Sequence, residues 1–78
     1  MGTIHQVEVV IHVDETLSED HRASLVNNLQ GRDGVEKASF TPGRDHLMLI
    51  DYDSNKLDSR DVLGYLLQEN VSAELIGI

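Results

Sequence analysis

Residues 4–13, IHQVEVVIHV, carry the strongest indication of the fold. From Val7 to Val13 every second residue is a branched apolar one, and the positions between them are more polar. This period of two is typical of a strand that buries one face against a core and turns the other outward. Three later segments also have strand character: residues 35–40, residues 46–53 (HLMLIDYD) and residues 71–78 (VSAELIGI).

A helix is predicted between the first two strands. Its start falls within residues 14–20, DETLSED, where two residues can supply the capping oxygen. Thr16 stands three residues before Glu19, as in a capping box, and Ser18 is the second candidate. The helix is expected to end near Gln30, because glycines follow closely. Its buried stripe is marked by Leu25, Val26 and Leu29.

A second helix is predicted after residues 46–53. Asp58 is a good N-cap residue, and Leu57 and Val62 have the spacing of a hydrophobic staple around it. Asn70 tolerates the left-handed backbone conformation and marks the end of this helix. The segment therefore has both a start and a stop signal. Its buried stripe is expected to consist of Val62, Leu63, Leu66 and Leu67.

The predicted order is strand, helix, strand, strand, helix, strand, within a single domain that spans residues 1–78. Crossover connections are right-handed, which makes this order a split βαβ arrangement. We therefore expect an α+β fold, the ferredoxin-like βαββαβ two-layer sandwich. In this fold a four-stranded antiparallel sheet carries two helices on one face.

Charge and composition exclude several classes of partner and site. The chain has 14 acidic and 6 basic residues, a formal net charge of −8. Nucleic acid and anionic membrane surfaces repel such a chain, so neither is expected as a partner, whereas a basic protein surface or a cation is attracted. The absence of cysteine excludes disulfides and thiolate metal sites and fits a reducing compartment. With no signal-peptide pattern, we expect a cytoplasmic protein.

Several residues together make the sequence similar to a known family. Gly34-Val35 follows the first helix, and Ile-Asp-Tyr-Asp occupies residues 50–53 of the third strand. These features resemble the heavy-metal-associated (HMA) domain family of small copper chaperones and metal-pumping ATPases, over nearly the whole chain. The resemblance implies the ferredoxin-like fold already expected. The remaining matches are generic to that fold: Val13, Leu25, Leu29, Val62, Leu63, Leu66 and Leu67.

The functional motif of that family, Gly-Met-x-Cys-x-x-Cys in the first loop, is absent from this sequence. Counting back from Leu25, its two cysteine positions fall on Ser18 and His21, and its Gly-Met positions fall on Glu15 and Thr16. Cu(I) is a soft ion that is held by soft sulfur ligands. The resemblance therefore implies the scaffold of the family without its copper chemistry.

The first loop and the helix start form a candidate metal site. Asp14, Glu15, Ser18 and His21 offer carboxylate, hydroxyl and imidazole donors, which suit a divalent ion such as Zn²⁺, Ni²⁺ or Mn²⁺. The alternative is structural, since capping and the helix dipole favour acidic residues at a helix N-terminus. No other cofactor is expected.

The open face of the predicted sheet is a candidate interface. An exposed apolar patch on the order of several hundred Å² is typical of an interaction surface, so we expect a homodimer or a protein partner docked on this face. The alternative is that Leu47 and Leu49 form an ordinary edge-strand run, or that the register differs by one residue. Strand parity places six residues on this face: Val10, His12, Leu47, Leu49, Ile76 and Ile78.

Nothing in the sequence supports catalysis. Ser18 and His21 stand three residues apart, but a Ser–His pair also needs an orienting group and an oxyanion hole. Glycine motifs for phosphates or dinucleotides are absent. We therefore predict a non-catalytic binding or interaction module that acts through the open sheet face or the first loop. The alternative is an accessory protein for a divalent metal, bound by Asp14, Glu15 and His21.

Overall fold

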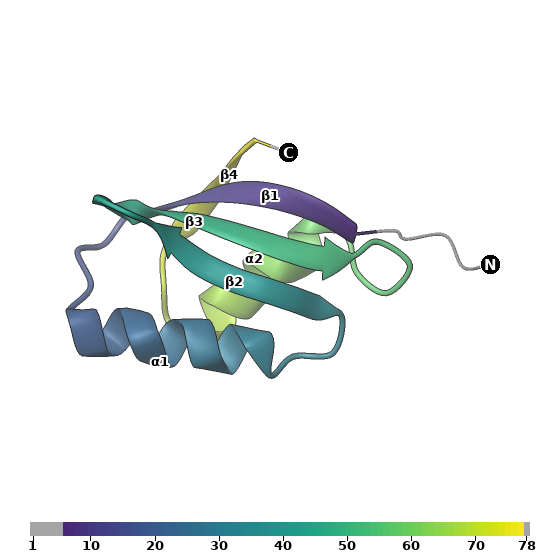
Figure 1. Cartoon of the computed structure of the whole chain (residues 1–78), viewed down its shortest axis with the longest axis horizontal. Helices are drawn as coiled ribbons and strands as arrows, with labels where there is room; N and C mark the ends of the chain where they lie inside the picture. Colours follow the sequence, from purple (N-terminus) through teal and green to yellow (C-terminus); the bar gives the residue numbers. More distant parts are fainter. Residues whose placement is uncertain (1–5, 78) are drawn as a thin grey trace.

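A computed structural model describes residues 6–77 of the chain. It confirms the predicted βαββαβ order and the ferredoxin-like two-layer sandwich (Figure 1). Four strands form one antiparallel sheet in the order β2-β3-β1-β4. The elements are β1 (Gln6–Val13), α1 (Glu19–Gln30), β2 (Val35–Thr41), β3 (Arg44–Asp53), α2 (Ser59–Gln68) and β4 (Ala73–Gly77).

Both helices lie on the same face of the sheet (Figure 1). Helix α1 packs near β2 and helix α2 near β4, so the two helices cover the two sides of one face. Neither helix is long and apolar enough to cross a bilayer. The opposite face of the sheet carries no helix within residues 6–77 (Figure 1).

The core lies between the sheet and the helices and follows the parity read from the sequence. Val9 and Ile11 of β1 are fully buried, and they lie opposite Ile50 and Met48 of β3. The helices bury only part of their predicted stripes: Val26 and Leu63 are half-buried, and Leu67 of α2, which was predicted to be buried, is 56% exposed. Four helical residues are at most 1% exposed: Leu25, Leu29, Val62 and Leu66.

The helix ends show which of the predicted caps are used. Ser18 is the N-cap of α1, and its Oγ accepts the backbone N–H of His21 at 3.1 Å. Of the two candidates for this cap, the structure therefore selects Ser18 over Thr16. Asp58 caps α2 as predicted, and Asp61 completes a reciprocal capping box with it.

Two strands begin at other residues than the pattern indicated. Strand β3 starts two residues earlier than predicted, at Arg44, because its pairing with β2 continues to the turn, where Thr41 lies opposite Arg44. Strand β4 starts two residues later, at Ala73. The reason is that Val71 completes the end of α2 instead: Asn70 has the predicted left-handed backbone, with φ of 62°, and the Val71 N–H bonds to the carbonyl of Leu66.

Candidate functional site

The sheet face opposite the helices carries a short apolar strip. Val10 of β1 lies directly opposite Leu49 of β3, and His12 lies opposite Leu47. Cross-strand partners project from the same face, so these side chains lie together, where strand parity predicts them. All four are partly exposed, which leaves apolar surface in contact with solvent.

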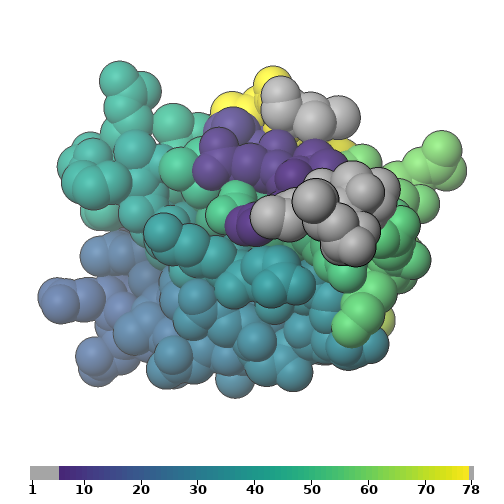
Figure 2. All heavy atoms as spheres, turned by 45° about the vertical axis from the view of Figure 1, so that its right-hand side comes forward, coloured from purple at the N-terminus to yellow at the C-terminus, as the bar shows by residue number. Residues whose placement is uncertain are grey.

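Strand β4 extends this strip at a bulge. The β1–β4 register shifts beside Val10, which lies opposite Gly77, and Ile76 is left as the extra residue. Ile76 is 53% exposed. Figure 2 shows atoms of β1 (purple) reaching the surface between those of β4 (yellow) and those of the β2–β3 hairpin (teal). Ile78, the sixth residue of the predicted interface, lies outside the described residues.

Acidic residues border the apolar strip at both of its ends. At one end Glu8 lies opposite Asp51, and Lys37 of β2 lies on the other side of the same Asp51. At the other end stand Glu74 of β4 and Asp14, which directly follows β1. Carboxylates outnumber the single ammonium group in this set, so the border of the strip is negatively charged.

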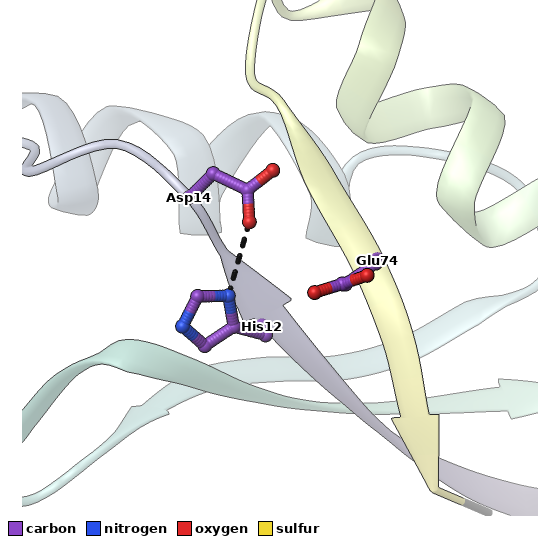
Figure 3. A group of neighbouring side chains, drawn as sticks. All are labelled: His12, Asp14 and Glu74. Atoms are coloured by element: carbon purple, nitrogen blue, oxygen red, sulfur yellow. Dashed lines mark hydrogen bonds and ion pairs between the residues drawn. The ribbon is translucent and has the colours of Figure 1, made fainter.

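Three of the polar side chains at one end of the strip form a close group (Figure 3). His12 and Asp14 are two residues apart on an extended chain, so they project to the same side, and Glu74 is the cross-strand partner of His12. The Nδ1 atom of His12 lies 3.1 Å from Oδ1 of Asp14. One potential ligand atom from each of the three residues lies within 4.8 Å of the others. The side chains of His12 and Asp14 are 41% and 52% exposed, so the group is open to solvent.

A second imidazole packs against this group. The rings of His46 and His12 are stacked, with centroids 5.9 Å apart and 17° between their planes. The Nδ1 atom of His46 lies 2.8 Å from the carbonyl oxygen of Val13. Because a carbonyl only accepts hydrogen bonds, this nitrogen carries the proton. A hollow of about 550 Å³ beside the two rings is lined also by Gly43, Arg44, Asp45 and Leu47.

The four metal-site residues predicted from the first loop are not gathered into one group. Glu15 Oε1 accepts the backbone N–H of Ser72 at 2.7 Å, which ties the loop to the segment before β4. Ser18 is engaged as the cap of α1. Within residues 6–77, Asp14 belongs to a set of His, Asp and Glu side chains whose potential ligand atoms lie within 4.8 Å of one another, and Glu15 and His21 do not.

Glu74 is the member of the close group that sequence patterns do not reveal. The spacing of His12 and Asp14 is visible in the sequence, but Glu74 reaches them only through the β1–β4 register. The alternation of residues in β4 indicates which face of the sheet Glu74 occupies. Because of the bulge beside Val10, the sequence does not indicate which residue of β1 lies opposite Glu74.

Comparisons with known proteins identify the fold through solved structures alone. No family model matches the sequence, and no curated protein matches it. The N-terminal domain of a potential copper-translocating P-type ATPase from Bacillus subtilis, in its Cu(I)-loaded state, has a TM-score of 0.79 at 11% identity, covering 92% of this chain and 89% of that one. The yeast copper transporter domain Ccc2a has a TM-score of 0.75 at 16% identity, covering 90% and 94%. The first domain of the human copper chaperone for SOD1 has a TM-score of 0.72 at 22% identity, covering 97% of both chains.

These identities are too low to carry function, but the coverage is high in both directions, so the likeness establishes the fold. The sequence has no cysteine at any position. The chain therefore has the ferredoxin-like fold of these copper-binding domains, the fold that its resemblance to heavy-metal-associated domains implies, and it contains no cysteine.

Proposed function

We propose that this chain is a non-catalytic binding module that docks a protein partner on the open face of its sheet, and that this partner presents an apolar centre with a basic rim. The observation that carries the proposal is the strip of Val10, Leu47 and Leu49, which is partly exposed and bordered by carboxylates. Ile76 adds a side chain that is 53% exposed at the β4 side of the strip.

An apolar centre with a polar, solvent-accessible border is the usual composition of a protein interface. Removing apolar surface from water contributes about 25 cal/mol per Å² before the costs of association. A specific interface buries roughly 800 Å² on each partner, so the partner must also cover the border of the strip. The carboxylates of that border favour a basic surface and accelerate its encounter. The strip therefore supplies affinity, and the border selects the partner.

A second copy of this chain fits the open face less well than a basic partner does. In a two-fold dimer the same patch of both subunits meets itself. The acidic groups of Glu8, Asp51 and Glu74 would then approach an equally acidic border, and a net charge of −8 on each subunit adds to the repulsion. Charge complementarity thus favours a different, basic protein over a homodimer.

We propose neither copper transport nor catalysis for this chain. Solved structures of the same fold include a copper-binding domain and a Cu(I)-loaded copper transporter domain. The loop positions at which the sequence resemblance would place cysteines hold Ser18 and His21 here, which offer oxygen and nitrogen in place of sulfur. The hydroxyl of Ser18 is bonded to the backbone N–H of His21 and serves as a helix cap. We propose the cytoplasm as the compartment in which this cysteine-free module meets its partner.

The proposal is tested by capturing proteins on the immobilised full chain and mapping the purified complex by hydrogen exchange. We expect protection of backbone amides in β1 and β3, and binding that weakens as salt concentration rises. The Leu49→Asp substitution should abolish capture, because it places a charge at the centre of the strip. Leu67→Asp is the matched control, since Leu67 is a 56% exposed leucine on α2, in the helical layer of the molecule.

Circular dichroism and urea unfolding of each variant would show that the fold is retained. Protection located on the helices would contradict the proposal, as would capture that survives Leu49→Asp and does not respond to salt. The absence of any captured protein from the source cells would contradict it too. If sedimentation showed a dimer that Leu49→Asp converts to a monomer, the occupant of the open face would be a second copy of this chain and not a basic partner.

A further inference from the structure

An imidazole and two carboxylates converge at the end of β1. His12 and Asp14 leave the same side of the chain, and Glu74 stands opposite His12 on β4, with one ligand atom of each within 4.8 Å of the others (Figure 3). We propose that His12, Asp14 and Glu74 bind a divalent transition-metal cation, with Zn²⁺ as the preferred ion and water completing its coordination.

The donor set determines which ions fit. One imidazole nitrogen and two carboxylate oxygens are ligands that Zn²⁺ accepts, and three protein ligands with one water is a common arrangement at zinc sites that stay open to solvent. Ca²⁺ requires six to eight oxygen ligands, and Cu(I) prefers sulfur. We therefore expect Zn²⁺ and Co²⁺ to bind, and Ca²⁺ and Cu(I) to bind weakly or not at all.

The site needs little rearrangement to receive a cation. His12 Nδ1 already faces Asp14 Oδ1 at 3.1 Å. On binding, the His12 ring takes the tautomer with its proton on Nε2 and offers the Nδ1 lone pair to the ion. The stacked ring of His46 restricts the orientation of His12, and His46 is itself held by the carbonyl of Val13. Two of the three donors stand on hydrogen-bonded strands, which keeps them in place.

The charge around the group also favours a cation. The two carboxylates carry two negative charges beside an imidazole, and the chain as a whole carries −8. Such a field raises the local concentration of cations. Arg44 lines the neighbouring hollow together with Asp45, so the hollow contributes charges of both signs.

This site is distinct from the helix start at which HMA domains carry cysteines. Those positions are Ser18 and His21, on the segment that enters α1, whereas the proposed donors lie on β1, just after it, and on β4. No donor belongs to the apolar strip of Val10, Leu47 and Leu49, but Asp14 and Glu74 also form part of its acidic border, so the metal site and the docking surface share two carboxylates.

Isothermal titration of the chelator-treated chain with ZnCl₂, together with NMR of the histidine rings, tests the site. We expect one ion per chain and a shift of the His12 ring resonances. His12→Ala and Glu74→Gln should each weaken binding by at least about tenfold, because the loss of a direct ligand costs no less than the loss of a supporting one. All of these side chains are surface groups, so the variants should remain folded.

His21→Ala is the matched control, because it removes an exposed histidine outside the proposed site and should leave the affinity unchanged. No saturable heat with Zn²⁺ would overturn the proposal, as would equal binding by wild type and His12→Ala. Loss of binding in His21→Ala and Glu15→Gln would assign the ion to the first loop instead. Leu49→Asp should bind Zn²⁺ like wild type, so failure of the metal site and failure of the docking function are separately visible.

Discussion

Gly34 approaches Leu57 so closely that a β-carbon on the glycine would stand 2.8 Å from both Cγ and Cδ1 of the leucine. Gly34 also has φ of +93°, a conformation that L side chains rarely adopt. Its carbonyl accepts the N–H of Asp53 at 2.8 Å, so this residue joins the start of β2 to the end of β3. A side chain at this position would separate the loop before α2 from the start of β2.

Gly34→Ala should therefore destabilise the protein by about 2–5 kcal/mol, the sum of backbone strain and overpacking. Urea unfolding measures the change. Gly43→Ala is the control, because Gly43 has φ of +75° but its added β-carbon would meet nothing within 4 Å. Strain alone should cost the control about 1–2 kcal/mol. Equal losses in the two variants would show that the contact with Leu57 contributes nothing.

Gly64→Ala should change the stability of the protein in the opposite direction. Gly64 lies inside α2, and an added β-carbon would meet no neighbouring atom within 4 Å. Alanine loses less conformational entropy than glycine when a helix forms, so the substitution should raise the free energy of unfolding by roughly 0.5–1 kcal/mol. Thermal unfolding followed by circular dichroism would detect the gain, and a lower melting temperature would contradict this reasoning.

The features that the sequence predicted best are those that depend only on neighbouring residues in the chain. Alternation in residues 4–13 assigned Val9 and Ile11 to the core and Val10 to the open face, because strand parity depends on nothing outside the strand. Asp58 and Asn70 located the ends of α2 for the same reason, since capping and left-handed backbone are properties of a few neighbouring residues.

Features that depend on distant partners were not predictable. The choice between Thr16 and Ser18 stayed open because both carry a hydroxyl, and only the path of the loop decides between them. The group that joins Asp14 to His12 and Glu74 requires the register of two strands at opposite ends of the chain, with a bulge between them. Sequence spacing therefore placed Asp14 with the loop residues that follow it.

The ion pair between Lys56 and Asp33 should be visible in a titration. The Asp33 carboxylate lies 3.1 Å from Lys56 Nζ, and its hydrogen bond and charge raise the pKa of Lys56 above its ordinary 10.5. A raised pKa in the folded state means that the pair stabilises the fold fully below pH 10.5 and loses this effect as the pH rises through the folded pKa. NMR titration should show a lower Lys56 pKa in Asp33→Asn than in the wild type. An unchanged pKa would exclude Asp33 as the cause.

Ser18→Ala should destabilise the protein by about 1 kcal/mol, because the first turn of α1 loses the acceptor for the His21 N–H. Thr16→Ala removes the rival hydroxyl two residues earlier and should change stability by less than about 0.5 kcal/mol. Urea unfolding of the two variants compares them directly. A larger loss in Thr16→Ala would mean that the helix in solution begins earlier than residue 19.

Ser18 and His21, the loop positions at which the resemblance to heavy-metal-associated domains would place cysteines, should accept a thiolate pair. Ser18 is the N-cap and His21 stands three residues later, so side chains at these positions lie on one face of the first turn of α1. The helix N-terminus also lowers the pKa of a thiol, which favours the thiolate. Ser18→Cys combined with His21→Cys should therefore bind one equivalent of Cu(I) in competition with a chromogenic chelator, whereas wild type and the single Ser18→Cys variant should release the ion to the chelator. Tight stoichiometric Cu(I) binding by wild type would show instead that oxygen and imidazole donors suffice on this scaffold, which conflicts with the softness of the ion.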